Sequence, residues 1–259
     1  AHVARTMSPL PAGPFAVSLP SDITNPGDIW RRLGNRVRGS TLARPAGYGQ
    51  MAGIASLRKA IAGYVRRSRT VNCHPDQVII TAGTQQGLYL AANLLREPDE
   101  DVWVEDPAYP GTTAIFETSG QARQMCRVPV DSQGIEVAVG ERLCQGARIA
   151  FVTPSHQYPL GHAMSMQRRS QLVHWARTRN AWIVEDDYDS EFRYTGHPFP
   201  SLYGMAPDRV IYLGTFSKIL FPSLRLGYVI VPEDQVDAWC GARLLMDRQP
   251  PDSNQHILA

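Results

Sequence analysis

Lysine is nearly absent from this sequence: of its 26 basic residues only Lys59 and Lys218 are lysines, and all the others are arginines. Arginine stays protonated and is no amine nucleophile, so chemistry that needs a primary amine has only two side-chain candidates. A large excess of charge is also absent, because the net charge is +2. This balance gives no general attraction to nucleic acid or to an anionic membrane.

Cysteine patterns and long apolar runs are lacking as well. The four cysteines form no C-x-x-C pair and have no histidine at zinc-finger spacing, so we expect neither a zinc site nor a disulfide framework but four reduced thiols. No apolar run approaches the roughly 18–20 residues of a membrane helix, and the first residues do not resemble a signal peptide. We therefore expect a cytoplasmic protein without a membrane partner.

What is present is the composition of a folded chain: 259 residues, 43% hydrophobic and 19% charged. This length favours one large domain, or one domain and part of another. Residues 1–27 are rich in proline and have little periodicity, which predicts a linker or N-terminal arm. The globular domain is predicted over residues 28–259.

Apolar runs of four to seven residues alternate along this domain with longer segments at helical spacing. We predict strands at 77–81, 102–105, 123–128, 148–153, 182–186, 209–214 and 226–231, and helices at 28–37, 54–66, 85–95, 111–118, 135–144, 165–178 and 232–246. The strand runs lack clean alternation, as in strands covered on both faces. The fold class is therefore α/β, a mainly parallel seven-stranded sheet between helices.

Polar clusters follow five of these apolar runs. In a parallel sheet, ligands collect where the carboxyl ends of the strands meet the following turns, so the clusters are expected to share one edge. They lie at residues 83–85, 106–109, 154–157, 186–188 and 215–218.

Two of the clusters have more than one interpretation. The turn at residues 81–87 could bind a phosphate at a helix N-terminus, or be an ordinary turn capped by Thr84. It lacks the glycine patterns of nucleotide-binding loops. The acidic run at 185–189 needs a cation nearby, which could be a metal or a protonated heterocycle nitrogen, or it is a solvated turn. A metal hydrolase would use Asp186, Asp187 and Asp189, but no histidine completes a ligand set.

Lys218 carries the most specific chemistry. A lysine at a strand end, near hydroxyls and an arginine, can form a Schiff base with a carbonyl compound beside a bound phosphate. The alternative is a surface cation. These pieces together resemble the fold-type I pyridoxal-phosphate enzymes of the aspartate aminotransferase family, from about residue 29 to the C-terminus. The resemblance implies the large domain of that fold, with pyridoxal 5'-phosphate as the cofactor.

The resemblance assigns a role to each matching residue. Lys218, preceded by Ser217, would form the internal aldimine and be the catalytic residue, and Thr215 and Arg225 would bind the phosphate together with the turn of Gly83, Thr84 and Gln85. Tyr109 would stack on the cofactor ring, Asp186 would hold the pyridine nitrogen protonated, and Tyr188 and Gln157 would lie near the 3-oxygen. Tyr48, in Y-G-Q-M-A-G, would reach the phosphate of the second subunit in a homodimer. No metal is implied.

Two stretches narrow the resemblance to a subgroup. T-P-S-H-Q-Y-P-L-G at 153–161 and E-D-D-Y-D-S-E-F-R-Y at 185–194 are similar to the MocR/GabR-type transcription regulators of the GntR family. The resemblance implies a domain that binds pyridoxal phosphate and senses a small amino compound. DNA would be bound only by a winged helix, which does not precede residue 1, and the small C-terminal domain is also missing, so we expect a piece of a longer chain. The alternative is a genuine aminotransferase acting on an amino acid, so whether the chain is an enzyme stays open.

Overall fold

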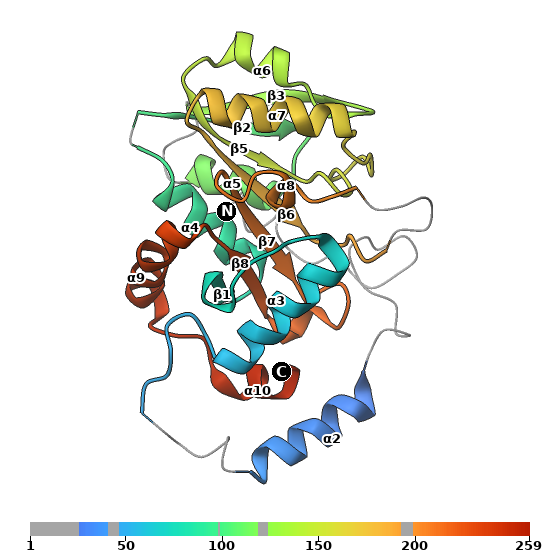
Figure 1. Cartoon of the computed structure of the whole chain (residues 1–259), viewed down its shortest axis with the longest axis vertical. Helices are drawn as coiled ribbons and strands as arrows, with labels where there is room; N and C mark the ends of the chain where they lie inside the picture. The colour runs from blue at the N-terminus through green and yellow to red at the C-terminus, as the bar shows by residue number, and fades with distance from the viewer. Residues whose placement is uncertain (1–25, 41–46, 98, 119–123, 193–198) are drawn as a thin grey trace.

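A computed structural model describes residues 26–40, 47–97, 99–118, 124–192 and 199–259 (Figure 1). At the centre of this described part is an eight-stranded sheet in the order β1-β8-β7-β6-β5-β2-β3-β4. The strands are β1 (Val78–Thr81), β2 (Asp101–Asp106), β3 (Met125–Asp131), β4 (Gly134–Ile135), β5 (Ala147–Val152), β6 (Trp182–Asp187), β7 (Val210–Thr215) and β8 (Gly227–Ile230). Strands β3, β2, β5, β6 and β7 are parallel, whereas β8 runs antiparallel to both β7 and β1.

Helices cover both faces of the sheet (Figure 1). The described helices are α2 (Gly27–Arg38), α3 (Ala55–Arg69), α4 (Thr84–Leu94), α5 (Pro110–Thr118), α6 (Val137–Leu143), α7 (Met166–Thr178), α8 (Leu202–Met205), α9 (Val236–Asp247) and α10 (Asp252–Leu258). Residues of α3, α6, α7 and α8 share one hydrophobic core, and residues of α4, α5 and α9 share the other. Helices α2 and α10 pack together at one end of the molecule.

The two cores explain why the strands are apolar without alternation. Successive residues of β7 point to opposite faces, so Tyr212 enters the core of α3 and α7 while Ile211 and Leu213 enter the core of α4 and α9. All six residues of β7 are buried. The predicted α/β class with a mainly parallel sheet between helices is confirmed.

The structure corrects several details of the sequence analysis. The sheet has an eighth strand in the described residues, because 134–135 pair with β3 instead of starting a helix. Cys126 and Cys144 form a disulfide between β3 and the end of α6, with Cα atoms 6.4 Å apart, so the expectation of four reduced thiols is wrong. The first part of the predicted strand at 123–128, and nearly all of the predicted arm at 1–27, lie outside the described residues. The boundary at residue 28 stays a prediction.

None of the helices in the described segments combines the length and the apolarity that crossing a membrane requires.

Candidate functional site

The five polar clusters lie together at the carboxyl edge of the sheet. Strands β2, β5, β6 and β7 are parallel, so their carboxyl ends meet at this edge. Strand β1 joins them because it is antiparallel to β8, which is antiparallel to β7, with Thr81, Gly227 and Thr215 in register. The segments after five strands therefore surround one pocket, as the sequence predicts.

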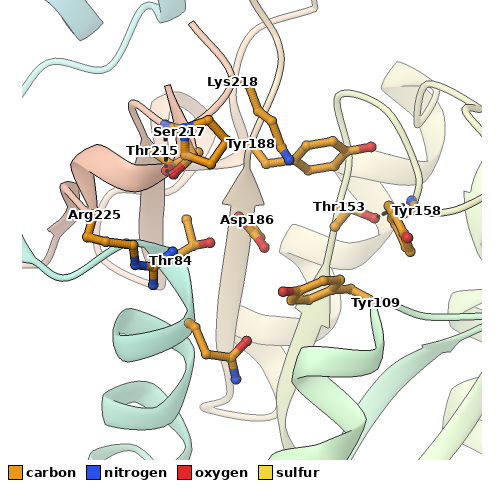
Figure 2. A pocket seen from close by; sticks show the side chains of 13 residues that line it. Thr84, Tyr109, Thr153, Tyr158, Asp186, Tyr188, Thr215, Ser217, Lys218 and Arg225 are labelled. Carbon is orange, nitrogen blue, oxygen red and sulfur yellow. Dashed lines mark hydrogen bonds between the residues drawn. The ribbon is translucent and has the colours of Figure 1, made fainter. Parts of the chain in front are cut away.

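The pocket has a volume of about 170 Å³. Figure 2 shows Asp186 at its centre, with Thr84, Thr215, Ser217 and Arg225 on one side and Tyr109, Thr153 and Tyr158 on the other. The complete lining is Gly83, Thr84, Gln85, Tyr109, Thr153, Tyr158, Asp186, Tyr188, Thr215, Ser217, Lys218, Pro222 and Arg225.

One side of the pocket is suited to an anion. The first turn of α4 lies against it, and the first N–H groups of a helix have no acceptor within the helix. Gly83 caps this helix at φ 88° and ψ 172°, a region that essentially only glycine adopts. Arg225 reaches the same turn, where its Nη2 donates to the carbonyl oxygen of Ala82 at 2.8 Å. The hydroxyls of Thr215 and Ser217, 3.1 Å apart, lie on the same side of the pocket. The helix N–H groups, these two hydroxyls and the Arg225 guanidinium together offer hydrogen-bond donors and one positive charge to an anion.

Asp186 is the acid at the centre of the pocket. It is the fifth residue of β6 and is 6% exposed, and its Oδ1 is buried without a hydrogen-bond partner among the described residues. Burial raises the pKa of Asp186 to about 7, and the negative charges of Asp187, Asp189 and Glu105 add to the effect, while Lys218 opposes it. A buried carboxylate oxygen that lacks a donor is suited to a ligand that brings its own N–H group.

The next residue, Asp187, points away from the pocket into a buried network. Its Oδ2 accepts hydrogen bonds from Arg69 Nε at 2.6 Å, Tyr212 Oη at 2.5 Å and Ser190 Oγ at 2.9 Å. Arg69, the last residue of α3, also donates to Ser155 Oγ at 2.7 Å. This network ties the end of α3 to the segments that follow β5 and β6, and so fixes the backbone beside Asp186.

Lys218 follows β7 and lies on the pocket wall, with its amine directed toward Tyr188 in Figure 2. Partial burial lowers the pKa of the Lys218 ammonium, while the carboxylates of Asp189 and Asp186 oppose this effect. A lowered pKa increases the fraction of neutral amine, which is the nucleophilic form. Asp189 is itself held by His156, whose Nδ1 lies 2.8 Å from Asp189 Oδ1.

Aromatic rings form the side of the pocket opposite the anion-binding groups. Tyr158 packs edge-on against both Tyr109 and Tyr188, with ring centroids 5.6 Å and 6.2 Å apart. Burial raises the pKa of the Tyr188 phenol above its ordinary value, and the charges of Asp189 and Asp186 raise it further. Tyr188 therefore stays a neutral hydrogen-bond donor at physiological pH.

These groups fit pyridoxal phosphate in three respects. The start of α4, the two hydroxyls and Arg225 suit a phosphate. The Oδ1 of Asp186, which has no partner within the described part of the chain, suits a protonated ring nitrogen, and Lys218 supplies a primary amine in the same cavity. The flat ring of Tyr109 suits a heteroaromatic ring.

The pocket contains ten of the twelve residues that the sequence singles out, and the two others lie elsewhere. The side-chain amide of Gln157 is buried and donates to Glu105 Oε2 and to the carbonyl oxygens of Pro107 and Tyr158, so it fixes the loop after β5 instead of lining the pocket. Tyr48 is 79% exposed, with the guanidinium of Arg248 stacked 4.0 Å from its ring centroid. The roles of the ten lining residues stay predictions.

Sequence reasoning missed three residues of the lining: Thr153, Tyr158 and Pro222. Thr153 and Tyr158 belong to the distinctive stretch at 153–161, which was a signal for them. Pro222 follows the Lys218 segment without a pattern of its own. No three His, Cys, Asp or Glu side chains in the described residues gather in an arrangement that could hold a metal ion.

The chain matches known proteins over most of its length. The family Aminotransferase class I and II matches residues 40–246. The chain is 40% identical over 215 residues to the probable rhizopine catabolism regulatory protein MocR of Rhizobium meliloti, covering 83% of this chain and 43% of that protein. It is 35% identical over 251 residues to the pyridoxine biosynthesis regulator PdxR of Corynebacterium glutamicum. This match covers 97% of this chain and 53% of PdxR.

Among solved structures, the fold is similar to LysN, an α-aminoadipate aminotransferase of Thermus thermophilus complexed with N-(5'-phosphopyridoxyl)-L-leucine. The TM-score is 0.85 at 27% identity, over 94% of this chain and 62% of LysN. The chain thus spans about half the length of the two regulators that it matches, and a larger part of the aminotransferase.

Proposed function

Because the chain belongs to the class I and II aminotransferase family, we propose that it is the pyridoxal-phosphate-binding, effector-sensing part of a MocR-type transcription regulator. The higher identity to two transcription regulators, 40% and 35%, than to the aminotransferase LysN, 27%, supports the regulatory role. In this proposal the effector is a small amino compound, and the protein works in the cytoplasm.

One observation carries the proposal for the cofactor. Asp186 is a buried carboxyl with one oxygen that no described residue contacts by a hydrogen bond, and it lies in the same cavity as Lys218 and the anion-binding start of α4. The phosphate would be held by the N–H groups of residues 83–85, by the hydroxyls of Thr215 and Ser217, and by Arg225. Asp186 would hold the proton on the ring nitrogen, Tyr109 would stack on the ring, and Tyr188 would donate to the 3-oxygen.

When bound, pyridoxal phosphate supplies an aldehyde carbon that reacts with primary amines. Lys218 is the amine placed to meet it, and the lowered pKa of Lys218 keeps a larger fraction neutral than an exposed lysine would have. A small amino compound would compete with Lys218 for the same carbon. A compound that binds two conformations of the domain with different affinity shifts their populations, and so would change DNA binding by the whole regulator. DNA contact itself would be made by a winged helix elsewhere in the whole protein.

Lys218 can be tested directly because the sequence contains one other lysine, Lys59. Incubation with pyridoxal phosphate followed by borohydride reduction should attach one phosphopyridoxyl group to Lys218, because it is the amine in the pocket. Peptide mass spectrometry locates the group, and absorbance near 420 nm reports it before reduction. Lys218→Arg should lose both signals.

Lys59→Arg is the matched control, because Lys59 is the other lysine and is exposed on α3. It should leave the stoichiometry and the absorbance unchanged. Attachment to Lys59 and not to Lys218, or an adduct that persists in Lys218→Arg, contradicts the proposed site.

The second candidate is a genuine aminotransferase, which the likeness to LysN and the lowered pKa of the Lys218 ammonium favour. Lys218 would then also move the proton between substrate carbon and cofactor. The two candidates differ in turnover. Amino acids should change the absorbance of the loaded regulator without releasing stoichiometric keto acid, and multiple turnovers with a keto-acid acceptor would instead establish the enzyme.

A further inference from the structure

The peptide group of Ala82 is held from both sides at the edge of the pocket. Ala82 lies between β1 and Gly83, the residue that caps α4. Its carbonyl oxygen accepts from Arg225 Nη2 at 2.8 Å, and its N–H donates to Gln86 Oε1 at 2.8 Å. Arg225 lines the pocket, whereas Gln86 is not part of its lining. Gln86 therefore acts from behind the pocket on the residue that Arg225 contacts.

Gln86 is the third residue of α4, and its side chain turns back toward the start of the helix. Glutamine at this helix position often accepts from a backbone N–H group at the helix start. Here the donor is the N–H of Ala82, just before the cap. The hydrogen bond ties this turn to the first turn of α4, whose N–H groups are the proposed anion donors.

Helix α9 packs beside α4 and holds the Gln86 side chain in place (Figure 1). Arg243 of α9 donates from Nη1 to the same Oε1 of Gln86, and Asp247 Oδ2 accepts from Gln86 Nε2 at 3.1 Å. Arg243 and Asp247 also pair with each other, with Nη1 and Oδ2 3.2 Å apart. Both ends of the Gln86 amide are thus bonded, which fixes its orientation.

The burial of Arg243 is not explained by stability. Its side chain is 1% exposed, and its Nε has no hydrogen-bond partner within the ranges that the structure describes. A buried cation whose donors are not all satisfied costs free energy, which a hydrophobic side chain of similar volume would avoid. What Arg243 supplies and such a side chain would not is the hydrogen bond to Gln86.

We propose that Gln86 is a positioning residue for the phosphate of the cofactor, and that Arg243 and Asp247 of α9 keep it in place. This inference rests on the proposed function, because it deepens the role given there to Arg225 and to the start of α4. Without the Gln86 amide, the peptide of Ala82 is held on one side alone. Arg225 and the first N–H groups of α4 are then less well aligned on the phosphate.

The groups proposed for the ring and the aldehyde do not depend on Gln86. Asp186 belongs to β6 and Lys218 follows β7, so neither lies on the turn that Gln86 holds. Loss of the Gln86 amide should therefore weaken a ligand that carries a phosphate and spare one that does not. Pyridoxal, which has the same ring and aldehyde but a hydroxyl in place of the phosphate, provides the comparison.

The test measures the equilibrium constants for adduct formation at Lys218 with pyridoxal phosphate and with pyridoxal, by titration of the absorbance near 420 nm on the full chain. Gln86→Met keeps the length of the side chain and removes its hydrogen bonds. The constant for pyridoxal phosphate should fall about fivefold, the loss expected for one hydrogen bond, and the constant for pyridoxal should not change. Pyridoxal also forms an internal hemiacetal, which affects all variants equally, so ratios between variants are compared.

Arg243→Met tests the contribution of α9, and it serves if Gln86→Met does not fold. Gln86 can still bond to Ala82 in this variant, but its amide is no longer held by Arg243. The constant for pyridoxal phosphate should therefore fall by a smaller factor, about twofold, again without a change for pyridoxal.

The matched control is Asn93→Leu, which removes an amide from the same helix. The Asn93 side chain is exposed and donates to the carbonyl oxygen of Tyr89 at 2.6 Å, so neither constant should change. Equal falls for both aldehydes in Gln86→Met would mean that Gln86 only stabilises the fold. An unchanged constant for pyridoxal phosphate would mean that it does not act on the phosphate, and either result overturns the proposal.

Hydrogen exchange of the Ala82 amide, measured by NMR on the chain freed of cofactor, separates this inference from the proposed function. The Ala82 N–H donates to Gln86, so its exchange should be about fivefold faster in Gln86→Met, and an unchanged rate would overturn the proposal. If the unsubstituted chain forms no adduct at Lys218, the proposed function fails and the phosphate role of Gln86 fails with it. If the adduct forms but Gln86→Met does not discriminate between the two aldehydes, this inference alone fails.

Discussion

The three consecutive carboxylates at the end of β6 have three different surroundings. Glu185 accepts from the backbone of α8, Asp186 faces the pocket, and Asp187 accepts from Arg69. The alternation of side chains along a strand explains why Glu185 and Asp186 point to opposite faces of the sheet. The sequence does not point to Arg69, because this partner of Asp187 lies 118 residues earlier and no local pattern marks it.

Among the arginines of α3, we expect substitution of Arg69 to lower the stability of the protein most, because Arg69 forms a buried ion pair with Asp187. Arg69→Met leaves Asp187 buried without its cation, so the free energy of unfolding should fall by about 3–5 kcal/mol. Arg67→Met, on the exposed face of the same helix, should change it by less than about 0.5 kcal/mol. Urea denaturation compares the two variants. Equal effects would mean that the ion pair contributes nothing beyond helix propensity.

Elements differ in how well the sequence predicts them. The long strands and helices were predicted with ends within a few residues, because each buries an apolar run or an apolar face. Strand β4, of two residues, and helix α8, of four, were missed, because so few residues display no period. Helix α10 was also missed; its apolar residues come only at its end. At the site, the sequence predicts that the turns after the strands line the pocket. It does not predict that the Gln157 side chain points away from the pocket, because this depends on a hydrogen bond to Glu105, 52 residues earlier.

The junction between β1 and α4 depends on the backbone conformation of Gly83. Gly83→Ala forces alanine into a conformation reserved for glycine and places its Cβ 3.1 Å from Arg225 Nη2. Stability should fall by about 1–3 kcal/mol, and pyridoxal phosphate should bind about tenfold more weakly because Arg225 and the first N–H groups of α4 are displaced.

Gly241→Ala is the control for this substitution. It lies within α9, where a Cβ would meet nothing within 4 Å, so it should be neutral or stabilise the chain by up to about 1 kcal/mol. Thermal unfolding and cofactor titration distinguish the two variants. Unchanged cofactor affinity in Gly83→Ala would remove this turn from the phosphate site.

The exposure of Tyr48 is consistent with a cofactor site that is shared between two copies of the chain. Tyr48 lies outside the pocket of its own chain, and its segment is held by Arg248 and by a hydrogen bond from the Gly49 N–H to the Gln249 side chain. Large apolar side chains, among them Tyr89 on α4 and Leu245 on α9, are also exposed. A second copy that covers part of this surface would bring its own Tyr48 with it.

This arrangement predicts that cofactor affinity depends on assembly. The chain should sediment as a dimer, and its occupancy with pyridoxal phosphate should fall on dilution below the dimer dissociation constant. Tyr48→Phe should weaken binding by about 1 kcal/mol, or roughly fivefold, because one hydrogen bond to the phosphate is lost. A monomer that keeps full occupancy and unchanged affinity would contradict the shared site.

The contrast between an exposed Lys59 and a half-buried Lys218 has a consequence for chemical selectivity. Guanidinium groups, which make up the rest of the cationic residues, do not condense with aldehydes as amines do. An aldehyde reagent in solution therefore meets just one competing side-chain amine, and that amine lies on the open face of α3. Among the side chains of this chain, Lys59 is therefore the one amine that competes with Lys218 for an aldehyde, so few unproductive adducts should form on this domain before the aldehyde reaches the pocket.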